Sequence, residues 1–82
     1  MFGSLLRKAR LDASLTLESL GGKIGTTKGY ISGIENEKIR PPRDPKIRKV
    51  AKVLGVDEKV LLKAAWLDRM PSDVKVLFQP RT

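Results

Sequence analysis

The sequence predicts an all-α fold of five helices followed by a short C-terminal tail. Apolar residues recur at the three- and four-residue spacing of amphipathic helices. Glycine and proline divide the chain into segments of helical length, and a residue that favours a helix N-terminus precedes four of them. The chain has 82 residues, a length typical of one small domain. We expect this domain within residues 1–70, and a tail at residues 71–82 that is available for dimerisation.

The first helix is expected over residues 2–12, where apolar residues follow the helical period. Thr16 is a favourable N-cap for the second helix. Gly21 and Gly22 lie inside that second helix, where each glycine costs about 1 kcal/mol relative to alanine. We interpret these glycines as a mark of close approach by another helix, with Gly21 at the point of contact.

A turn that begins with glycine separates the second helix from the third. Gly25 favours the left-handed conformation that ends a helix. Thr26 and Thr27 then offer an N-cap for a third helix over residues 28–36, which has isoleucines on its inward face. Two short helices joined by a three-residue turn are typical of a helix-turn-helix. An ordinary helical hairpin is the alternative.

The second half of the chain is expected to form a loop and two more helices. Residues 37–44 make a basic loop stiffened by proline. Asp44 is expected to cap the fourth helix, which stops at Gly55. Asp57 is expected to cap the fifth helix, which ends before Pro71.

The fifth helix contains more apolar residues than one inward stripe needs. It carries Val60, Leu61, Ala64, Ala65 and Leu67, of which Leu61, Ala64 and Ala65 supply the stripe. The surplus apolar residues here and in the tail are Leu62, Trp66, Leu67, Met70, Val76, Leu77 and Phe78. Residues 74–78 fit a strand or a short helix equally well.

The charge distribution indicates a polyanion as partner. The net charge is +8, and residues 1–52 hold 12 basic and 5 acidic side chains, against 5 and 4 in the remainder. Such a split favours a nucleic-acid-binding N-terminal part, although a basic surface can also serve solubility alone.

The composition argues against catalysis and against a membrane span. The chain has no cysteine and no histidine, so it lacks thiolate metal ligands and the commonest general base at neutral pH. We therefore expect no enzyme activity, no cofactor and no metal. No apolar run approaches the roughly 20 residues of a membrane span, so we expect no membrane partner and a cytoplasmic, nucleoid-associated protein.

Three segments carry a family resemblance. They are KIGTTKGYISGIEN at residues 23–36, RPP at residues 40–42 and VAKVLGVD at residues 50–57. In order and spacing they resemble the phage repressor and Cro family of DNA-binding domains, to which XRE-type regulators belong. The resemblance covers residues 2–70. It implies five helices, a third helix that lies in the major groove, and binding as a dimer to a palindrome.

Two positions depart from the family pattern. Leu17 and Gly33 stand where members of the resembling family often carry a base-contacting glutamine or arginine. Both departures reduce hydrogen-bonding reach to the base edges.

The helical period places part of the third helix on an outward face. The residues of this face are Thr27, Lys28, Gly29, Ser32, Gly33 and Asn36. Lys28 is the best candidate to reach guanine O6 and N7. Thr27 could contact a base or cap the helix, and Ser32 is a weaker base contact. Gly29 and Gly33 would let the helix sit deep in the groove or accommodate a thymine methyl group.

Phosphate contacts are expected to flank this helix. Tyr30 could donate its hydroxyl to a phosphate or pack as a half-buried aromatic. The other candidates are Thr16 and Thr26 near helix N-termini, and the basic residues Lys38, Arg40, Arg43 and Lys46.

The resemblance also implies a structural ion pair between Arg10 in the first helix and Glu35 at the end of the third. In the family this pair is largely buried and holds the recognition helix on its scaffold.

The sequence favours a DNA-binding transcription regulator, more readily a repressor than an activator, that acts as a homodimer on a palindromic operator. The candidate dimerisation residues are Trp66, Met70, Leu77 and Phe78. Trp66 could instead fill the domain's own core, and the interface could instead lie in the loop at residues 37–44. The alternative function is an antitoxin-type protein-binding module that masks a toxin and autoregulates its operon.

Overall fold

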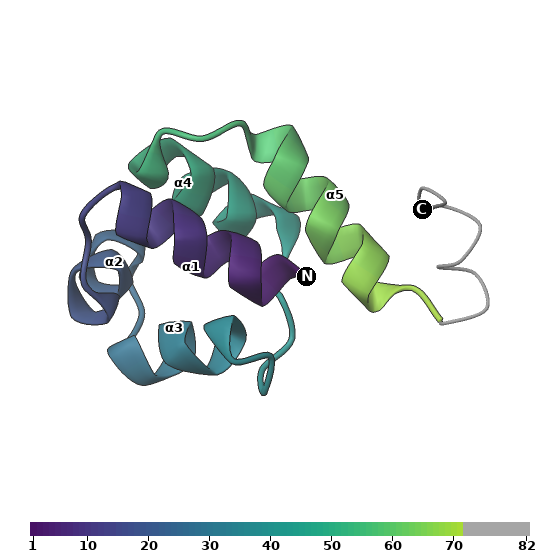
Figure 1. The fold of residues 1–82 in the computed structure, drawn as a ribbon, viewed down its shortest axis with the longest axis horizontal. Helices are drawn as coiled ribbons and strands as arrows, with labels where there is room; N and C mark the ends of the chain where they lie inside the picture. The colour runs from purple at the N-terminus through teal and green to yellow at the C-terminus, as the bar shows by residue number, and fades with distance from the viewer. Residues whose placement is uncertain (72–82) are drawn as a thin grey trace.

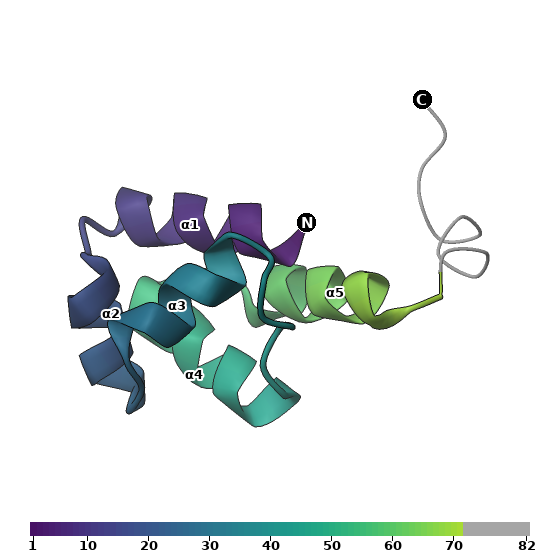
Figure 2. The same cartoon turned by 90° about the horizontal axis from the view of Figure 1, so that it is seen from below.

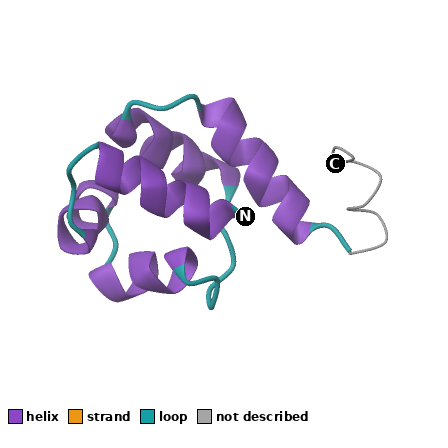
Figure 3. Ribbon diagram, in the orientation of Figure 1, coloured by secondary structure: helices purple, strands orange, loops and turns teal. Residues whose placement is uncertain are grey.

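The computed structural model describes residues 1–71, which form five helices packed around one core (Figure 1). The helices are α1 (Phe2–Asp12), α2 (Leu17–Ile24), α3 (Lys28–Glu35), α4 (Asp44–Leu54) and α5 (Glu58–Arg69). Within residues 1–71 there is no strand (Figure 3), and the predicted all-α class is confirmed. The expectations for residues 74–78, including Leu77 and Phe78, lie outside the described residues.

The helices pack so that α3 is left with one free side. α1 contacts α3 and α5, α2 contacts α3 and α4, and α4 contacts α5. In Figure 2 α3 faces the viewer, with α2 on one side and the loop that follows α3 on the other. The largest fully buried side chains are Phe2, Leu6, Leu20, Ile31, Ile47, Val50 and Leu61. None of the helices in the described range is both long and apolar enough to cross a membrane.

Local capping interactions begin and end the helices largely as predicted. Thr16 Oγ1 accepts a hydrogen bond from Ser19 N at 3.0 Å, and Asp57 Oδ1 accepts one from Lys59 N at 2.9 Å. Gly25 ends α2 at φ +77°, in the left-handed region that glycine adopts without strain. These expected helix boundaries are confirmed.

The predicted role of Asp44 is wrong. Asp44 is the first residue of α4 and makes no capping hydrogen bond. Its Oδ1 instead accepts hydrogen bonds from Trp66 Nε1 at 3.3 Å and from the Arg69 guanidinium at 3.4 Å. The carboxylate is therefore used in a tertiary contact with α5.

The predicted inward face of α5 needs a similar correction. Leu61, as expected, is buried, but Leu62 and Leu67 are also buried, although they were predicted to be surplus to the core. Val60 is 54% exposed and Trp66 is 51% exposed, so Trp66 does not fill the core. Because most positions of this helix are apolar, the helical period alone does not determine which face turns inward.

Candidate nucleic-acid interface

The turn between α2 and α3 lies directly against α2. A Cβ atom at Gly21 would come within 2.9 Å of the Thr26 carbonyl oxygen and 3.0 Å of the Thr27 carbonyl carbon. Thr26 N donates a hydrogen bond to the Gly21 carbonyl at 2.7 Å. Gly21 is therefore the point of close approach that the sequence predicted, whereas a Cβ at Gly22 would meet nothing within 4 Å.

A buried ion pair attaches α3 to α1. Arg10 Nε donates to Glu35 Oε2 at 2.6 Å and its NH2 donates to Oε1 at 3.0 Å, while NH1 donates to the Leu15 carbonyl at 2.8 Å. The two side chains are only 10% and 5% exposed. The hydrogen bond to Glu35 raises the pKa of the Arg10 guanidinium above its ordinary value. The paired hydrogen bonds of this ion pair attach the end of α3 to α1.

The outer face of α3 combines accessible and internally bonded groups. Lys28 and Gly29 are exposed. Thr27 is the N-cap of α3, and its Oγ1 accepts from Tyr30 N at 3.2 Å. Asn36 Nδ2 donates to the Ser32 carbonyl at 3.0 Å and approaches Ser32 Oγ at 3.3 Å. Lys28 therefore has the longest free side chain at the start of this face.

The surface of α3 at Gly33 is covered by a side chain from the following loop. A Cβ at this position would lie 2.8 Å from Ile39 Cγ1 and closer still to Cδ1. The loop after α3 folds back so that the Ile39 side chain lies over Gly33. Ile39 was not among the predicted site residues, because nothing in the local sequence indicates this return of the loop.

Basic side chains border α3 along the loop that follows it and at the start of α4. Lys38, Arg40 and Arg43 belong to the loop between α3 and α4, and Lys46 lies in the first turns of α4. Figure 2 shows this loop running from the C-terminal end of α3 to the start of α4. Lys46 Nζ lies 5.0 Å from the centroid of the Tyr30 ring, which is half-buried, so a cation–π contact joins α4 to α3.

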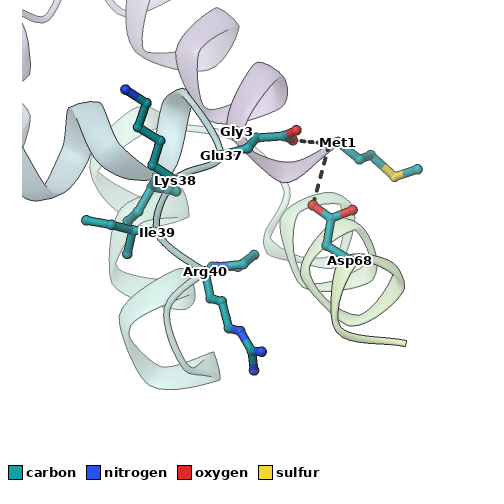
Figure 4. A pocket seen from close by; sticks show the side chains of 9 residues that line it. Met1, Gly3, Glu37, Lys38, Ile39, Arg40 and Asp68 are labelled. Carbon is teal, nitrogen blue, oxygen red and sulfur yellow. Dashed lines mark hydrogen bonds and ion pairs between the residues drawn. The ribbon is translucent and has the colours of Figure 1, made fainter. Parts of the chain in front are cut away.

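The acidic residues of this region are all held by internal partners. Between residues 26 and 52 they are Glu35, Glu37 and Asp44. Glu35 pairs with Arg10, Glu37 with the Met1 amine, and Asp44 with Arg69. Figure 4 shows the Met1 amine between Glu37 and Asp68, at the junction of α1, the loop and α5.

The basic side chains around α3 are in the opposite situation. Within residues 1–71, no ion pair involves Lys28, Lys38, Arg40, Arg43 or Lys46. The surface around α3 therefore presents positive charge that the fold itself does not neutralise, which suits a polyanion.

The candidate dimerisation residues are only partly described. Trp66 is half-exposed on α5, and Met70 lies at the end of that helix with intermediate exposure. Leu77 and Phe78 lie outside the described residues.

Known proteins share this arrangement. The HTH_3 helix-turn-helix family model matches residues 6–61. The chain belongs to this family. HTH_3 proteins are XRE-type DNA-binding helix-turn-helix regulators, and the resemblance to phage repressor and XRE-type domains is thereby confirmed.

Individual relatives are regulators or their complexes. RghRB of Bacillus subtilis (strain 168), an uncharacterized HTH-type transcriptional regulator, is 33% identical over 75 residues, which are 90% of this chain and 54% of RghRB. The chain thus spans about half the length of this curated relative.

Two solved structures of SinR resemble the domain. SinR, a master regulator for biofilm formation, in complex with DNA has a TM-score of 0.69 at 32% identity, covering 76% of this chain and 98% of that one. The complex of the SinR and SinI proteins has a TM-score of 0.68 at 28% identity, covering 94% of this chain and 74% of that one.

Proposed function

We propose that this HTH_3 protein is a sequence-specific transcription regulator that represses by binding double-stranded DNA as a homodimer on a palindromic operator. One observation carries the proposal: every acidic residue between positions 26 and 52 is bound internally, while the basic residues around α3 have no ion-pair partner within residues 1–71. The solved complex of SinR with DNA supports the same use of this fold. Binding to chromosomal DNA would place the protein in the nucleoid.

In this proposal α3 enters the major groove and its N-terminal half contacts the bases. Lys28 donates to guanine O6 and N7, and Thr27 and Ser32 make shorter-range contacts. The groups that position the helix on phosphates flank it. They are Thr16, Thr26, Tyr30, Lys38, Arg40, Arg43 and Lys46.

A second copy is needed for tight binding. One domain of this kind buries only about 600–1,000 Å² on DNA, and two-fold symmetric regulators read two half-sites about 10 base pairs apart, centre to centre. The exposed indole of Trp66 and the adjacent Met70 are the described groups for a two-fold interface, continued by the tail. Steric exclusion of polymerase from an overlapping promoter would then give repression.

The electrostatic part of the proposal is tested by the salt dependence of DNA affinity. With about six to eight phosphate contacts per dimer, log K against log salt should have a slope of about −5 to −7. Arg40→Ala and Arg43→Ala should each weaken binding to all DNA sequences to the same extent and make the slope less steep. Lys59→Ala, in the first turn of α5, is the matched control and should behave as wild type. An affinity that does not depend on salt would refute the proposal.

The homodimer is tested in the full chain. Trp66→Ala should shift sedimentation from dimer to monomer and weaken binding to a full palindrome, while affinity for an isolated half-site stays the same. Truncation after Pro71 should act in the same direction and leave the helical content nearly intact. A truncated protein that still sediments as a dimer would place the interface elsewhere, including the loop at residues 37–44.

A second candidate function is a protein-binding module of the antitoxin type that also binds its own operon. It is favoured by the half-exposed Trp66 and by a solved complex in which SinR is bound by the SinI protein. Co-purification of one small protein, lost on Trp66→Ala with DNA affinity retained, would favour this function over a simple repressor.

A further inference from the structure

One side chain on the outward side of α3 does not come from α3 itself. By the helical period Gly33 lies away from the buried Ile31 and Ile34, beside the more exposed Gly29 and Asn36. The atoms nearest to its missing side chain are Cγ1 and Cδ1 of Ile39. The recognition helix therefore carries an apolar group at a position where its own sequence has none.

Backbone hydrogen bonds hold Ile39 in this position. The Gly33 carbonyl accepts from Lys38 N at 2.9 Å and from Ile39 N at 3.1 Å, and the Ile34 carbonyl accepts from Glu37 N at 3.0 Å. Together with the left-handed Glu37, at φ +60°, these bonds form a Schellman motif at the end of α3. Ile39 is thus attached to the helix by a defined turn and moves with it.

Part of the Ile39 side chain remains open to a ligand. It is 39% exposed, and it points away from Met1 and Asp68, between Lys38 and Arg40 along the loop (Figure 4). Its two neighbours are basic residues without an ion-pair partner within residues 1–71. An apolar group within such a surface would face DNA, not the interior.

We infer that Ile39 is a specificity-determining residue that contacts the 5-methyl group of a thymine in the major groove. This inference rests on the proposed DNA binding. The thymine methyl is the apolar group that base edges present in the major groove, and an apolar side chain distinguishes it by contact. A side chain at Gly33 would occupy the space that Cγ1 and Cδ1 of Ile39 fill, so Ile39 would have to shift.

The test replaces thymine by uracil, which lacks only the methyl group. Duplexes are first selected from a randomised pool by the wild-type protein, and each thymine of the selected site is then changed to uracil in turn. Wild type should lose about three- to fivefold in affinity at one thymine per half-site, the value of one buried methyl group. For the Ile39→Ala variant, replacing that thymine by uracil should leave the DNA affinity unchanged.

The control and the variants keep the inference falsifiable. Val60→Ala shortens another exposed β-branched side chain, on α5 and remote from α3, and should show the wild-type uracil effect. Because the uracil-to-thymine ratio is taken within each variant, a general weakening by Ile39→Ala cancels. Ile39→Val removes only Cδ1 and should show a smaller loss of affinity on replacement of thymine by uracil than wild type. This variant separates the loss of the methyl contact from a loosening of the loop by alanine.

Three outcomes would overturn the inference. The uracil effect could persist in Ile39→Ala, no thymine could respond in wild type, or Ile39→Ala could convert a dimer to a monomer without changing any thymine ratio. The last result would assign Ile39 to a contact between two copies. If the wild-type protein selected no sequence from the pool, the proposed function itself would be refuted. That result differs from the three outcomes above, which refute only the role of Ile39.

Discussion

Alanine at the two adjacent glycines of α2 should change the free energy of unfolding in opposite directions. At Gly22 a Cβ would meet no atom within 4 Å. Gly22→Ala therefore keeps the full difference in helix propensity, and the protein should become more stable by about 0.5–1 kcal/mol.

At Gly21 the same methyl group would press on the backbone of the turn. It would lie 2.9 Å from the Thr26 carbonyl oxygen and 3.0 Å from the Thr27 carbonyl carbon, and neither is a flexible side-chain end. Overpacking of this kind costs about 1–3 kcal/mol. After the propensity gain of about 1 kcal/mol, Gly21→Ala should show a net loss of up to about 2 kcal/mol.

Urea denaturation followed by far-UV circular dichroism measures both changes, with each glycine as the control for the other. DNA affinity adds a second readout. Because Gly21→Ala moves the turn that orients α3, it should also weaken DNA binding under conditions where the variant is fully folded, whereas Gly22→Ala should not. If both substitutions stabilised the protein equally, the turn would not be held against α2 and the reasoning would be wrong.

Three further substitutions test other parts of the protein. Glu35→Gln leaves the buried Arg10 charge without its partner, so the free energy of unfolding should fall by about 3–5 kcal/mol in thermal or urea denaturation; a loss below about 1 kcal/mol, as for an exposed pair, would contradict this. Because folding raises the pKa of Arg10, its contribution is fully present below the unfolded pKa and is lost only above it, so the loss should be constant over about pH 6–9. Lys28→Ala should reduce discrimination at one base pair per half-site by about 1–3 kcal/mol when selected and shuffled duplexes are compared; equal weakening on both would make Lys28 a phosphate contact. Ser14→Gly removes the cost of a left-handed serine at φ +58°, which is about 1–2 kcal/mol, and after the added chain entropy of glycine it should raise stability by about 0.5 kcal/mol in thermal melts; a lower melting temperature would contradict it.

Helix boundaries were predictable wherever one residue sets them locally. Thr16, Gly25 and Asp57 act through their own side chain or backbone on the next few residues, and each does so in the structure. The close approach at Gly21 was predictable for a related reason, since a glycine that lowers helix stability usually has a packing role.

Contacts between distant segments were not predictable in the same way. Asp44 looks like an N-cap in its own segment, and only α5, more than 20 residues later, supplies the Trp66 and Arg69 groups that engage it. The placement of Ile39 over Gly33 depends on a loop that turns back on its helix. The left-handed position of that turn is occupied by Glu37 and not by glycine, so no glycine in the sequence indicates the turn.

The inward face of α5 was ambiguous for a simpler reason. Because seven of the twelve residues of α5 are apolar, more than one face fits the helical period, and the choice depends on the shapes of α1 and α4. Leu62 and Leu67 could be assigned to the core only after those helices were in place.

The contact between Arg69 and Asp44 gives α5 an influence on the proposed DNA-binding surface, although α5 itself lies away from the DNA. Through this contact, a residue of α5 affects the net charge of that surface. Arg69 also donates to the Pro42 carbonyl, so it neutralises a carboxylate and fastens the basic loop together. Without it, Asp44 would be free to attract Arg43 and Lys46 in competition with phosphate. A genetic selection for loss of operator binding would then recover substitutions of Arg69 together with substitutions of residues that contact DNA. The residues needed for binding would therefore include some that do not touch the DNA.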